Sequence, residues 1–559
     1  MTKKKKLAYI FLSITLFILL LVLVIPIGIN MYLNANAEKI VGNMITRTND
    51  FGGHEVDFGH IKFNYNFRGT FLELGDVTIK PGESIPEDKI KFDLTAENAY
   101  LTGFSWTSFL LNNSITLDSA YLENLSVTSL TPPMEDLEMT DEEEDDEEFG
   151  DNYDKISIER IRFNRLSYYN IDSGNDSVRM SIKDLSLAAN FFQLTKEDLK
   201  SDKALFSVDM LEGYMDEAAY HFNEYRNVVY ARDLSFNSQD RHLLIAGVEL
   251  DNKLERYEYI NQYEHETDWM ELEQGEIDIQ GMEFHEFFEK GIIHAETIKA
   301  KDLVISIFRD KRKPEDPTNR PEMVHDIIRD IPIPTFIHKL ELENGEISYD
   351  ERPDNQAPRA GSVFFKGVNA TISNITNMDE MLAKNNEMDL QAEGLLMGEG
   401  AIDLNVTFFL EDENGRFNMN GMIGQMPLPS INKMLGPGTR IAIDEGTLNS
   451  LQFNIVANDY EGTGDVEMRY QNLKIKILDS DYEKNQNIFR RAGAFLANTF
   501  VVRNDNPDSG GTMVKGDVYT KRDQTKFIFN YWWELLLSGM MSTMSGETEA
   551  EMREAERED

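Results

Sequence analysis

The chain has 559 residues, a formal net charge of −44 and no cysteine. An acidic surface repels phosphates, which argues against nucleic acid as a partner. The absence of cysteine excludes disulfides, iron–sulfur clusters, zinc–thiolate sites and thiol nucleophiles. A chain of this length has room for two or three domains or for one long repetitive domain.

The N-terminus combines a short basic tail, residues 1–6, with an uncharged apolar run at 7–33. About 20 apolar residues span a bilayer, and lysines before a span keep the N-terminus in the cytoplasm. A cleaved signal peptide is the alternative, with Ala35-Asn36-Ala37 as its cleavage site. Signal h-regions run only about 7–15 residues. The sequence therefore predicts an uncleaved transmembrane anchor, with the rest of the chain across the membrane.

Alternating apolar and polar residues predict β-strands in two segments after the anchor, 38–134 and 156–310. The segment between them, 135–155, is strongly acidic, which predicts a solvated, disordered loop. Cation capture is the alternative, but the run lacks the glycine and the ligand spacing of a calcium loop.

The second half of the chain begins with a linker at 311–335, which is rich in proline and charge and contains one short helical pattern. Strand patterns return over 336–529, where Asn414-Gly415 separates two alternating runs as in a hairpin. Residues 530–559 read as a hydrophobic helix followed by a charged tail.

A repeat runs through the strand segments. Residues 103–127 align without gaps on residues 281–305, at an offset of 178 residues. The second half of this unit recurs at Ile156, Ile337 and Ile441, with apolar residues at relative positions 1, 3, 6, 8, 11 and 13. Steps of two keep side chains on one face of a strand. Each step of three reverses that parity and marks a bulge or a tight bend.

An apolar sheet face has to be covered, and the chain has too few amphipathic helices to do so. Two architectures remain open, a β-sandwich with a filled core and a curled trough that holds an apolar ligand. In the second, the repeat positions line the trough. The candidate lining residues are Ile298, Ile305, Leu340, Leu342, Leu448 and Phe453.

The hydrophobic helix near the C-terminus has a wide apolar face and a narrow polar strip of Glu534, Ser538, Ser542 and Ser545. Such a face does not stay in water. The helix either plugs the end of the β groove or lies at a membrane interface, where tryptophans prefer to sit. The candidate membrane or partner contacts are Trp532, Trp533, Leu536 and Met540.

Catalytic motifs are missing from the sequence: there is no G-x-S-x-G, P-loop, dinucleotide fingerprint or H-E-x-x-H. The nine histidines are scattered. We expect no enzymatic activity, no metal site and no cofactor.

Two stretches resemble a known family. Residues 334–351, PTFIHKLELENGEISYDE, are close to the repeat "I-x-I-x-x-I-x-L-x-N-G-x-I-x-Y". Residues 417–453 carry a strand, a short "L-x-x-[LI]-N-x-[LM]-L" segment and then "I-x-I-x-x-G-x-[LI]-x-x-L-x-F". Together with the basic N-terminus and single anchor, they resemble the bacterial AsmA-like proteins. That resemblance implies an inner-membrane-anchored periplasmic protein, similar to bridge-like lipid-transfer proteins, with an apolar β groove that handles phospholipid.

The predicted fold is mostly β: an N-terminal transmembrane helix followed by an elongated, curled antiparallel β-sheet groove of repeats with few short helices. The predicted function is non-enzymatic envelope maintenance, in which phospholipid is bound or transferred between inner and outer membrane. The alternatives are an anchored scaffold that assists outer-membrane protein assembly without lipid transport, and a surface adhesin. The membrane and phospholipid are the expected partners, and the sequence names no protein partner.

Overall fold

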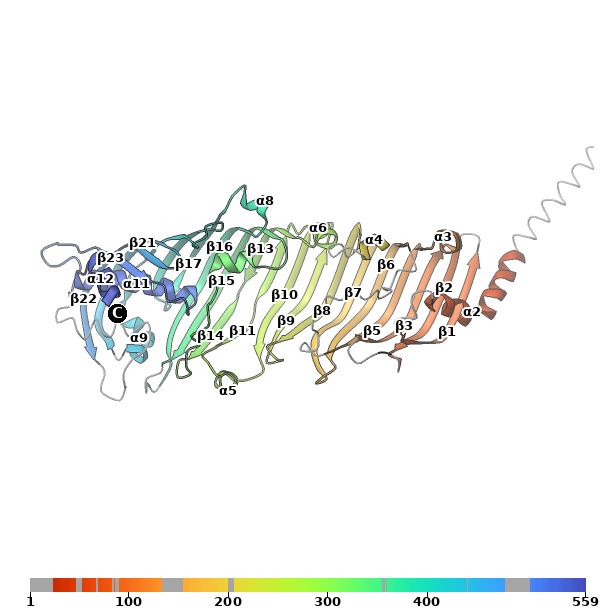
Figure 1. The fold of residues 1–559 in the computed structure, drawn as a ribbon, viewed down its shortest axis with the longest axis horizontal. Coiled ribbons are helices and arrows are strands. Elements are labelled where there is room, and N and C mark those ends of the chain that lie inside the picture. The colour runs from red at the N-terminus through yellow and green to blue at the C-terminus, as the bar shows by residue number, and fades with distance from the viewer. Residues whose placement is uncertain are drawn as a thin grey trace, which may run out of the picture. The chain divides into compact units, whose positions relative to one another are not determined.

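The computed structural model describes residues 24–46, 53–66, 69–82, 85, 90–132, 154–199, 206–353, 357, 359–439, 441–477 and 503–558. The described chain is mostly β, and 23 strands belong to one mixed sheet (Figure 1). It forms two compact units. Unit 1 comprises Met1–Tyr225, Arg232–Arg241 and Phe284–Gly291, and unit 2 comprises Arg226–Ala231, His242–Glu283 and Ile292–Asp559.

The strands of unit 1 pair mainly with their sequence neighbours in antiparallel order. They are β1 (Glu55–Asn66), β2 (Gly69–Lys80), β3 (Lys91–Phe104), β4 (Ser114–Leu117), β5 (Ser119–Thr131), β6 (Lys155–Asp172), β7 (Ser177–Thr195) and β8 (Met210–Phe222). Strand β9 (Asn227–Asn237) contributes residues to both units.

Unit 2 has the same kind of architecture, with a longer series of antiparallel pairings among its C-terminal strands. Its strands are β10 (His242–Asn252), β11 (Asp268–Leu272), β12 (Glu276–Gln280), β13 (Ile293–Lys301), β14 (Val304–Asp310), β15 (Thr335–Arg352), β16 (Gly361–Thr376), β17 (Glu387–Leu396), β18 (Gly400–Phe409), β19 (Phe417–Ile423), β20 (Met426–Pro427), β21 (Ile441–Ala457), β22 (Glu461–Ile477) and β23 (Gly516–Lys521).

The described helices are short, apart from one near the C-terminus. They are α2 (Ala37–Thr46), α3 (Trp106–Leu111), α4 (Lys196–Leu199), α5 (Arg256–Asn261), α6 (Phe284–Lys290), α7 (Val324–Arg329), α8 (Asp379–Leu382), η3 (Leu428–Ile431), α9 (Asn432–Thr439), α11 (Ile528–Ser545) and α12 (Glu549–Glu558). Residues 24–35 are also helical. The expectation of few short helices therefore fits the described elements.

The prediction of an antiparallel sheet was wrong at two places. Strands β4 and β5 run parallel to β6, and β13 and β14 run parallel to β15. An alternating pattern is the same in both directions, so the sequence did not reveal the difference. A parallel pair needs a crossover of a dozen or more residues. The linker at 311–335 contains the second crossover, with α7 inside it. The acidic segment at 135–155 belongs to the first, and most of it lies outside the described residues.

The internal repeat is a structural repeat, and its phase breaks are backbone distortions. At the second step of three, four copies place a non-glycine residue in the left-handed region: Asn124 (φ 49°), Arg165 (φ 60°), Asp302 (φ 53°) and Asn344 (φ 54°). The register shifts at the same points, between Phe163 and Leu166 and between Leu342 and Gly345. Such bulges bend a strand and increase its twist, as the spacing predicted.

Opposite the first step of three, a left-handed residue lies on the neighbouring antiparallel strand or directly after its end. That residue is Gly103 (φ 70°), Phe191 (φ 56°), Gly281 (φ 69°) or Asn374 (φ 62°) in the four copies. At Gly103 a Cβ atom would lie 2.1 Å from the Asp118 carboxyl carbon, so both the conformation and the space require glycine there. Each of these repeats therefore has two left-handed positions, one on each of two adjacent segments.

The helix at residues 24–35 hydrogen-bonds to the edge of β1. The Asn34 side chain donates to Phe63 O (2.7 Å) and accepts from Phe63 N (2.8 Å). One turn earlier, Asn30 makes the same pair of bonds with Tyr65. Two asparagines at i and i+4 thus satisfy backbone groups that a further strand would otherwise bind.

The predicted anchor at 7–33 lies largely outside the described residues. No helix in the described part of the chain has both the length and the apolar character to span a bilayer. The described end of the run does expose apolar side chains, among them Ile27 and Met31. The anchor stays a prediction.

Replacing Asn34 by alanine should open the edge of β1 locally. The Phe63 amide loses its acceptor, and an unmade hydrogen bond costs about 1–3 kcal/mol. We expect the Phe63 amide to exchange roughly tenfold faster in hydrogen-exchange measurements. Asn36→Ala is the matched control, because among the described residues the Asn36 side chain bonds within the helical segment, to Tyr32 O. Unchanged exchange at Phe63 in Asn34→Ala would contradict the proposed edge contact.

A buried polar cluster ties together two turns of unit 1. Asp172 accepts a hydrogen bond from Tyr225 (2.6 Å) and a charged one from Arg179 (2.7 Å), and it also accepts from Gly174 N. The bond from Tyr225 is the largest cause of a lowered pKa for Asp172, and Arg179 adds to it against the opposing effect of burial. The ionised carboxylate therefore stabilises unit 1 above the ordinary carboxyl pKa of about 4.

Asp172→Asn should destabilise unit 1 at pH 7 by about 2 kcal/mol, because two bonds to a charged acceptor become neutral. The contribution of Asp172 is lost as the pH falls through its lowered pKa, so wild type and variant should converge in acid. Thermal melting at pH 7 and pH 3 measures both effects. Asp176→Asn in the same turn is exposed and should match wild type. A difference that stays constant with pH would refute the electrostatic account.

Candidate apolar binding face

Strand register gathers the repeat positions of unit 2 into rows on one side of the sheet. Directly paired residues on neighbouring strands place their side chains on the same face. Ile298 of β13 pairs with Leu340 of β15, so two of the predicted lining residues are immediate neighbours. The first apolar row runs through Leu243, Ile279, Ile298, Leu340, Ile372, Leu390, Val406, Met419 and Ile455.

A second apolar row lies one step along the strands from the first. It joins Leu342 to Phe453 across five successive strand pairings, and both residues were predicted to line the groove. Its members are Ile245, Ile277, Ala300, Leu342, Ala370, Ala392, Leu404, Gly421, Phe453 and Val466.

The opposite face of the same strands is polar. Between the two apolar rows, the register aligns Lys299, Glu341, Thr371, Gln391, Asn405, Asn420, Asn454 and Asp465. Lys299 and Glu341 form an ion pair across this face at 3.5 Å. Unit 2 therefore has one apolar and one polar sheet face over at least eight strands, as the alternation of the sequence predicted.

Unit 1 repeats this arrangement by itself. One row passes through Phe63, Leu72, Leu101, Ala120, Ile161, Ala189 and Leu211, and another through Ile79, Leu94, Val127, Tyr168, Ile182 and Ala218. Members of the first row belong to small buried clusters at the two ends of the unit. The second row belongs to no buried cluster of the described residues, and its side chains are half-buried.

The described helices of unit 2 cover one part of its apolar face and leave another part uncovered. From β16 onward it is a closed core, because α7, α9, η3 and α11 pack on the strands. Phe453 is 2 % exposed and Leu448 is 3 % exposed in this core. Leu340 packs against its margin. The filled-core alternative therefore describes this part, and Leu448 and Phe453 lie where a ligand has no room.

The other part, over β10, β12, β13 and β15, is an open face. Within unit 2, no described helix packs extensively on β10, β12 or β13. Its side chains are half-buried and belong to none of the described buried clusters. The residues of this open face are Leu243, Ile245, Ile277, Ile279, Ile298 and Leu342. Ile305 is also half-buried and outside the clusters, paired with Leu272 and Ile347.

The C-terminal helix α11 lies across β22 and β23 (Figure 1). Trp532 is 9 % exposed, and Leu536 and Met540 pack against the closed core. Trp533 is half-buried. Trp532, Leu536 and Met540 thus face the sheet of unit 2, which is the arrangement expected of a plug. The membrane-interface alternative stays a prediction.

The polar strip of α11 has a structural use that the sequence did not reveal. Ser538 Oγ accepts from Tyr519 N (3.1 Å) and donates to Tyr519 O (2.8 Å) on β23. Ser542 Oγ accepts from Asp517 N at 2.8 Å. Serines at i and i+4 thus seal the edge of β23, as Asn30 and Asn34 seal the edge of β1. The signal in the sequence was the pair of small polar residues at helical spacing inside an apolar run.

Two comparisons of the chain with known proteins found no match. No model of a protein family matches it, and no curated protein matches its sequence. The AsmA-like resemblance therefore stays an expectation from the basic N-terminus, the apolar run and the repeat pattern.

Proposed function

We propose that this chain is a non-enzymatic lipid-handling protein of the bacterial envelope. It is anchored in the inner membrane by its N-terminal apolar run and extends into the periplasm. Its bulged β-repeats curl the sheet into a groove in the manner of AsmA-like proteins. The groove binds the acyl chains of phospholipid and passes lipid between inner and outer membrane.

The open face carries this proposal. A row of half-buried aliphatic side chains that no described helix of unit 2 covers is costly in water, because each exposed apolar Å² costs about 25 cal/mol. Soluble proteins rarely leave contiguous patches of this kind without a ligand or partner. An acyl chain is aliphatic and flexible, and it matches a row that offers no hydrogen-bonding group among its members.

The acidic, polar outer face supports the same proposal. It keeps the outer side of the sheet hydrated while the apolar face stays available to lipid. A phospholipid suits this arrangement, because its tails cover the apolar rows while its headgroup remains in water. Ordinary protein partners remain the competing occupants.

A vesicle assay tests the function. The full chain is reconstituted into donor liposomes that carry a fluorescent phospholipid, and unlabelled acceptor liposomes are added. We expect the label to reach the acceptors faster than from protein-free donors. Transfer at the protein-free rate, together with no lipid bound to the purified chain, would instead favour a scaffold that assists outer-membrane protein assembly.

A further inference from the structure

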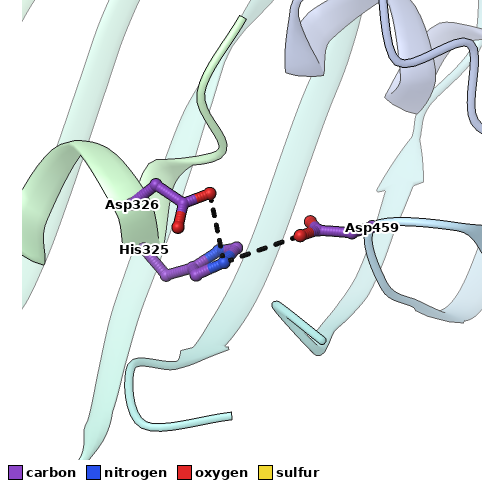
Figure 2. A group of neighbouring side chains, drawn as sticks. All are labelled: His325, Asp326 and Asp459. Atoms are coloured by element: carbon purple, nitrogen blue, oxygen red, sulfur yellow. Dashed lines mark ion pairs between the residues drawn. The ribbon is translucent and has the colours of Figure 1, made fainter. Parts of the chain in front are cut away.

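Three side chains with metal-binding atoms converge in unit 2 (Figure 2). His325 and Asp326 belong to α7, and Asp459 lies in the turn between β21 and β22. His325 Nε2 is 3.4 Å from Asp326 Oδ2 and 3.8 Å from Asp459 Oδ2. The three ligand atoms all lie within 4.8 Å of one another. The His325 side chain is only 5 % exposed, so its ring is held in place.

The separations do not suit direct hydrogen bonds. A charged N–H···O bond to a carboxylate measures about 2.7–2.9 Å, and both contacts of His325 are longer. In tetrahedral zinc sites with ligand bonds of about 2.0–2.2 Å, neighbouring ligand atoms lie roughly 3.3–3.6 Å apart. The observed 3.4 and 3.8 Å are close to that spacing.

Asp459 supplies an independent observation. Its Oδ1 atom is buried and has no hydrogen-bond partner among the described atoms. Such an atom ordinarily binds a donor, a water or an ion. Asp459 Oδ1 is therefore open to a further ligand.

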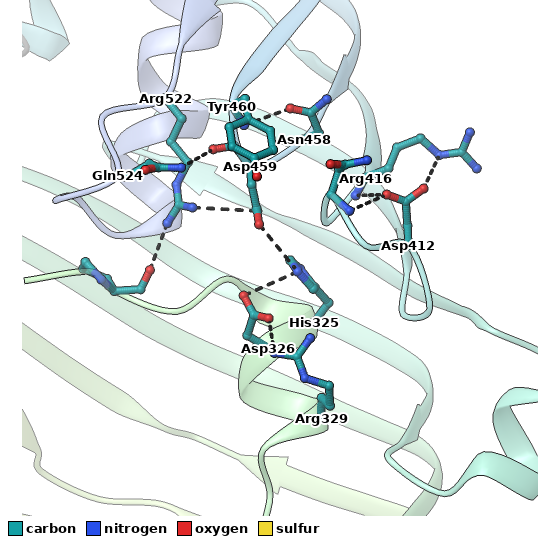
Figure 3. A network of polar contacts seen from close by, with 12 residues as sticks. His325, Asp326, Arg329, Asp412, Arg416, Asn458, Asp459, Tyr460, Arg522 and Gln524 are labelled. Atoms are coloured by element: carbon teal, nitrogen blue, oxygen red, sulfur yellow. Dashed lines mark hydrogen bonds and ion pairs between the residues drawn. The ribbon is translucent and has the colours of Figure 1, made fainter.

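Two neighbouring arginines form ion pairs with the carboxylates of the cluster (Figure 3). Arg522 Nη1 is 3.7 Å from Asp459 Oδ1, beyond hydrogen-bonding distance, and its other amino group donates to Pro321 O at 2.9 Å. Arg329 binds Asp326, but its side chain is 61 % exposed and its charge is screened by solvent.

Gly415 leaves room for the side chains of His325 and Asp459. Gly415, in the turn between β18 and β19, lies so near that a Cβ atom would be 2.1 Å from the His325 ring and 2.6 Å from Asp459 Oδ1. Any other residue would push these two side chains apart. The positive φ of Gly415, 64°, favours glycine for a second reason.

We propose that His325, Asp326 and Asp459 bind one zinc-class divalent cation. An imidazole with two carboxylates suits a transition metal better than magnesium or calcium, which prefer oxygen ligands alone. Three protein ligands leave a coordination position for water. The ion ties the linker helix α7 to the β21–β22 turn and so fastens the crossover to the closed core. This site is independent of the lipid function.

The test uses the full chain without a polyhistidine tag, purified in detergent and stripped of metal with a chelator. The protein is then dialysed against zinc in the presence of excess magnesium, which competes for the many surface carboxylates. Bound zinc is counted by mass spectrometry of the metal. Asp459→Asn is the main variant, because it keeps the size of the side chain. His285→Gln is the matched control, since His285 is exposed and pairs with Glu289 on α6.

We expect wild type and His285→Gln to retain one zinc ion that Asp459→Asn and His325→Gln bind roughly tenfold or more weakly. Hydrogen exchange on the wild type adds a readout that needs no variant: zinc should slow exchange in Val324–Arg329 and raise the melting temperature. Equal zinc binding by wild type and Asp459→Asn, or no effect of zinc on exchange in α7, would overturn the proposal.

Discussion

Leu342→Glu should remove bound phospholipid from the protein while leaving the protein folded. Leu342 is half-buried on the open face, so a glutamate there can reach water in the empty protein. In the lipid complex the same carboxylate would be buried against acyl chains, which costs several kcal/mol. Because 1.4 kcal/mol is a tenfold change in affinity, we expect bound lipid to fall at least about tenfold, measured by mass spectrometry of the purified chain.

Two further variants serve as comparisons for Leu342→Glu. Gln391→Glu adds the same charge on the exposed polar face and should keep its lipid. Phe453→Glu lies on the same apolar row but inside the closed core, where losing the ring alone costs about 3–5 kcal/mol and an unpaired charge adds to that cost. It should unfold unit 2. Full lipid occupancy in Leu342→Glu would place the lipid path elsewhere.

Gly539→Val should lift α11 from the sheet and strongly lower the melting temperature. Gly539 sits where helix and strands approach most closely: a Cβ atom there would lie 2.4 Å from Val466 and 2.7 Å from Val518. On the opposing strand, a Cβ at Gly516 would lie 2.1 Å from Gly539 O. Overpacking of such a contact typically costs 1–3 kcal/mol, and here it also breaks the serine contacts with β23.

Leu537→Val on the same helix is the control for this prediction. It introduces the same β-branched side chain at a half-buried position outside the closed core, so it should cost less than about 1 kcal/mol. Equal melting temperatures for wild type and Gly539→Val would show that α11 does not pack on β23. The helix would then be free for the membrane-interface role.

The bulges were predictable from the sequence because they change the period of the apolar pattern. The step from Leu342 to Gly345 marks the left-handed Asn344, and the step from Phe163 to Leu166 marks Arg165. When only one face of a strand is apolar, a one-residue insertion moves the following apolar side chains to the other face, so the insertion is visible in the sequence pattern. The same reasoning placed Ile298, Leu340, Leu342 and Phe453 on a common face.

Other features left no local signal. Parallel and antiparallel strands share a period of two, so the direction of β15 relative to β13 was invisible. The sequence also could not separate the open face from the closed core, because Leu342 and Phe453 have the same pattern around them. Only the packing of α7, α9 and α11 distinguishes the two. His325 and Asp459 are far apart in the chain, so their meeting depends on the tertiary fold.

Site-specific photocrosslinking in living cells tests the central claim most directly. A photoreactive amino acid replaces Leu342 on the open face in one strain, and its neighbour Glu341 on the opposite, polar face in another. The account predicts that phospholipid crosslinks to position 342 and not to position 341. Crosslinking of lipid at neither position, or at both equally, would contradict the assignment of the apolar face as a lipid path.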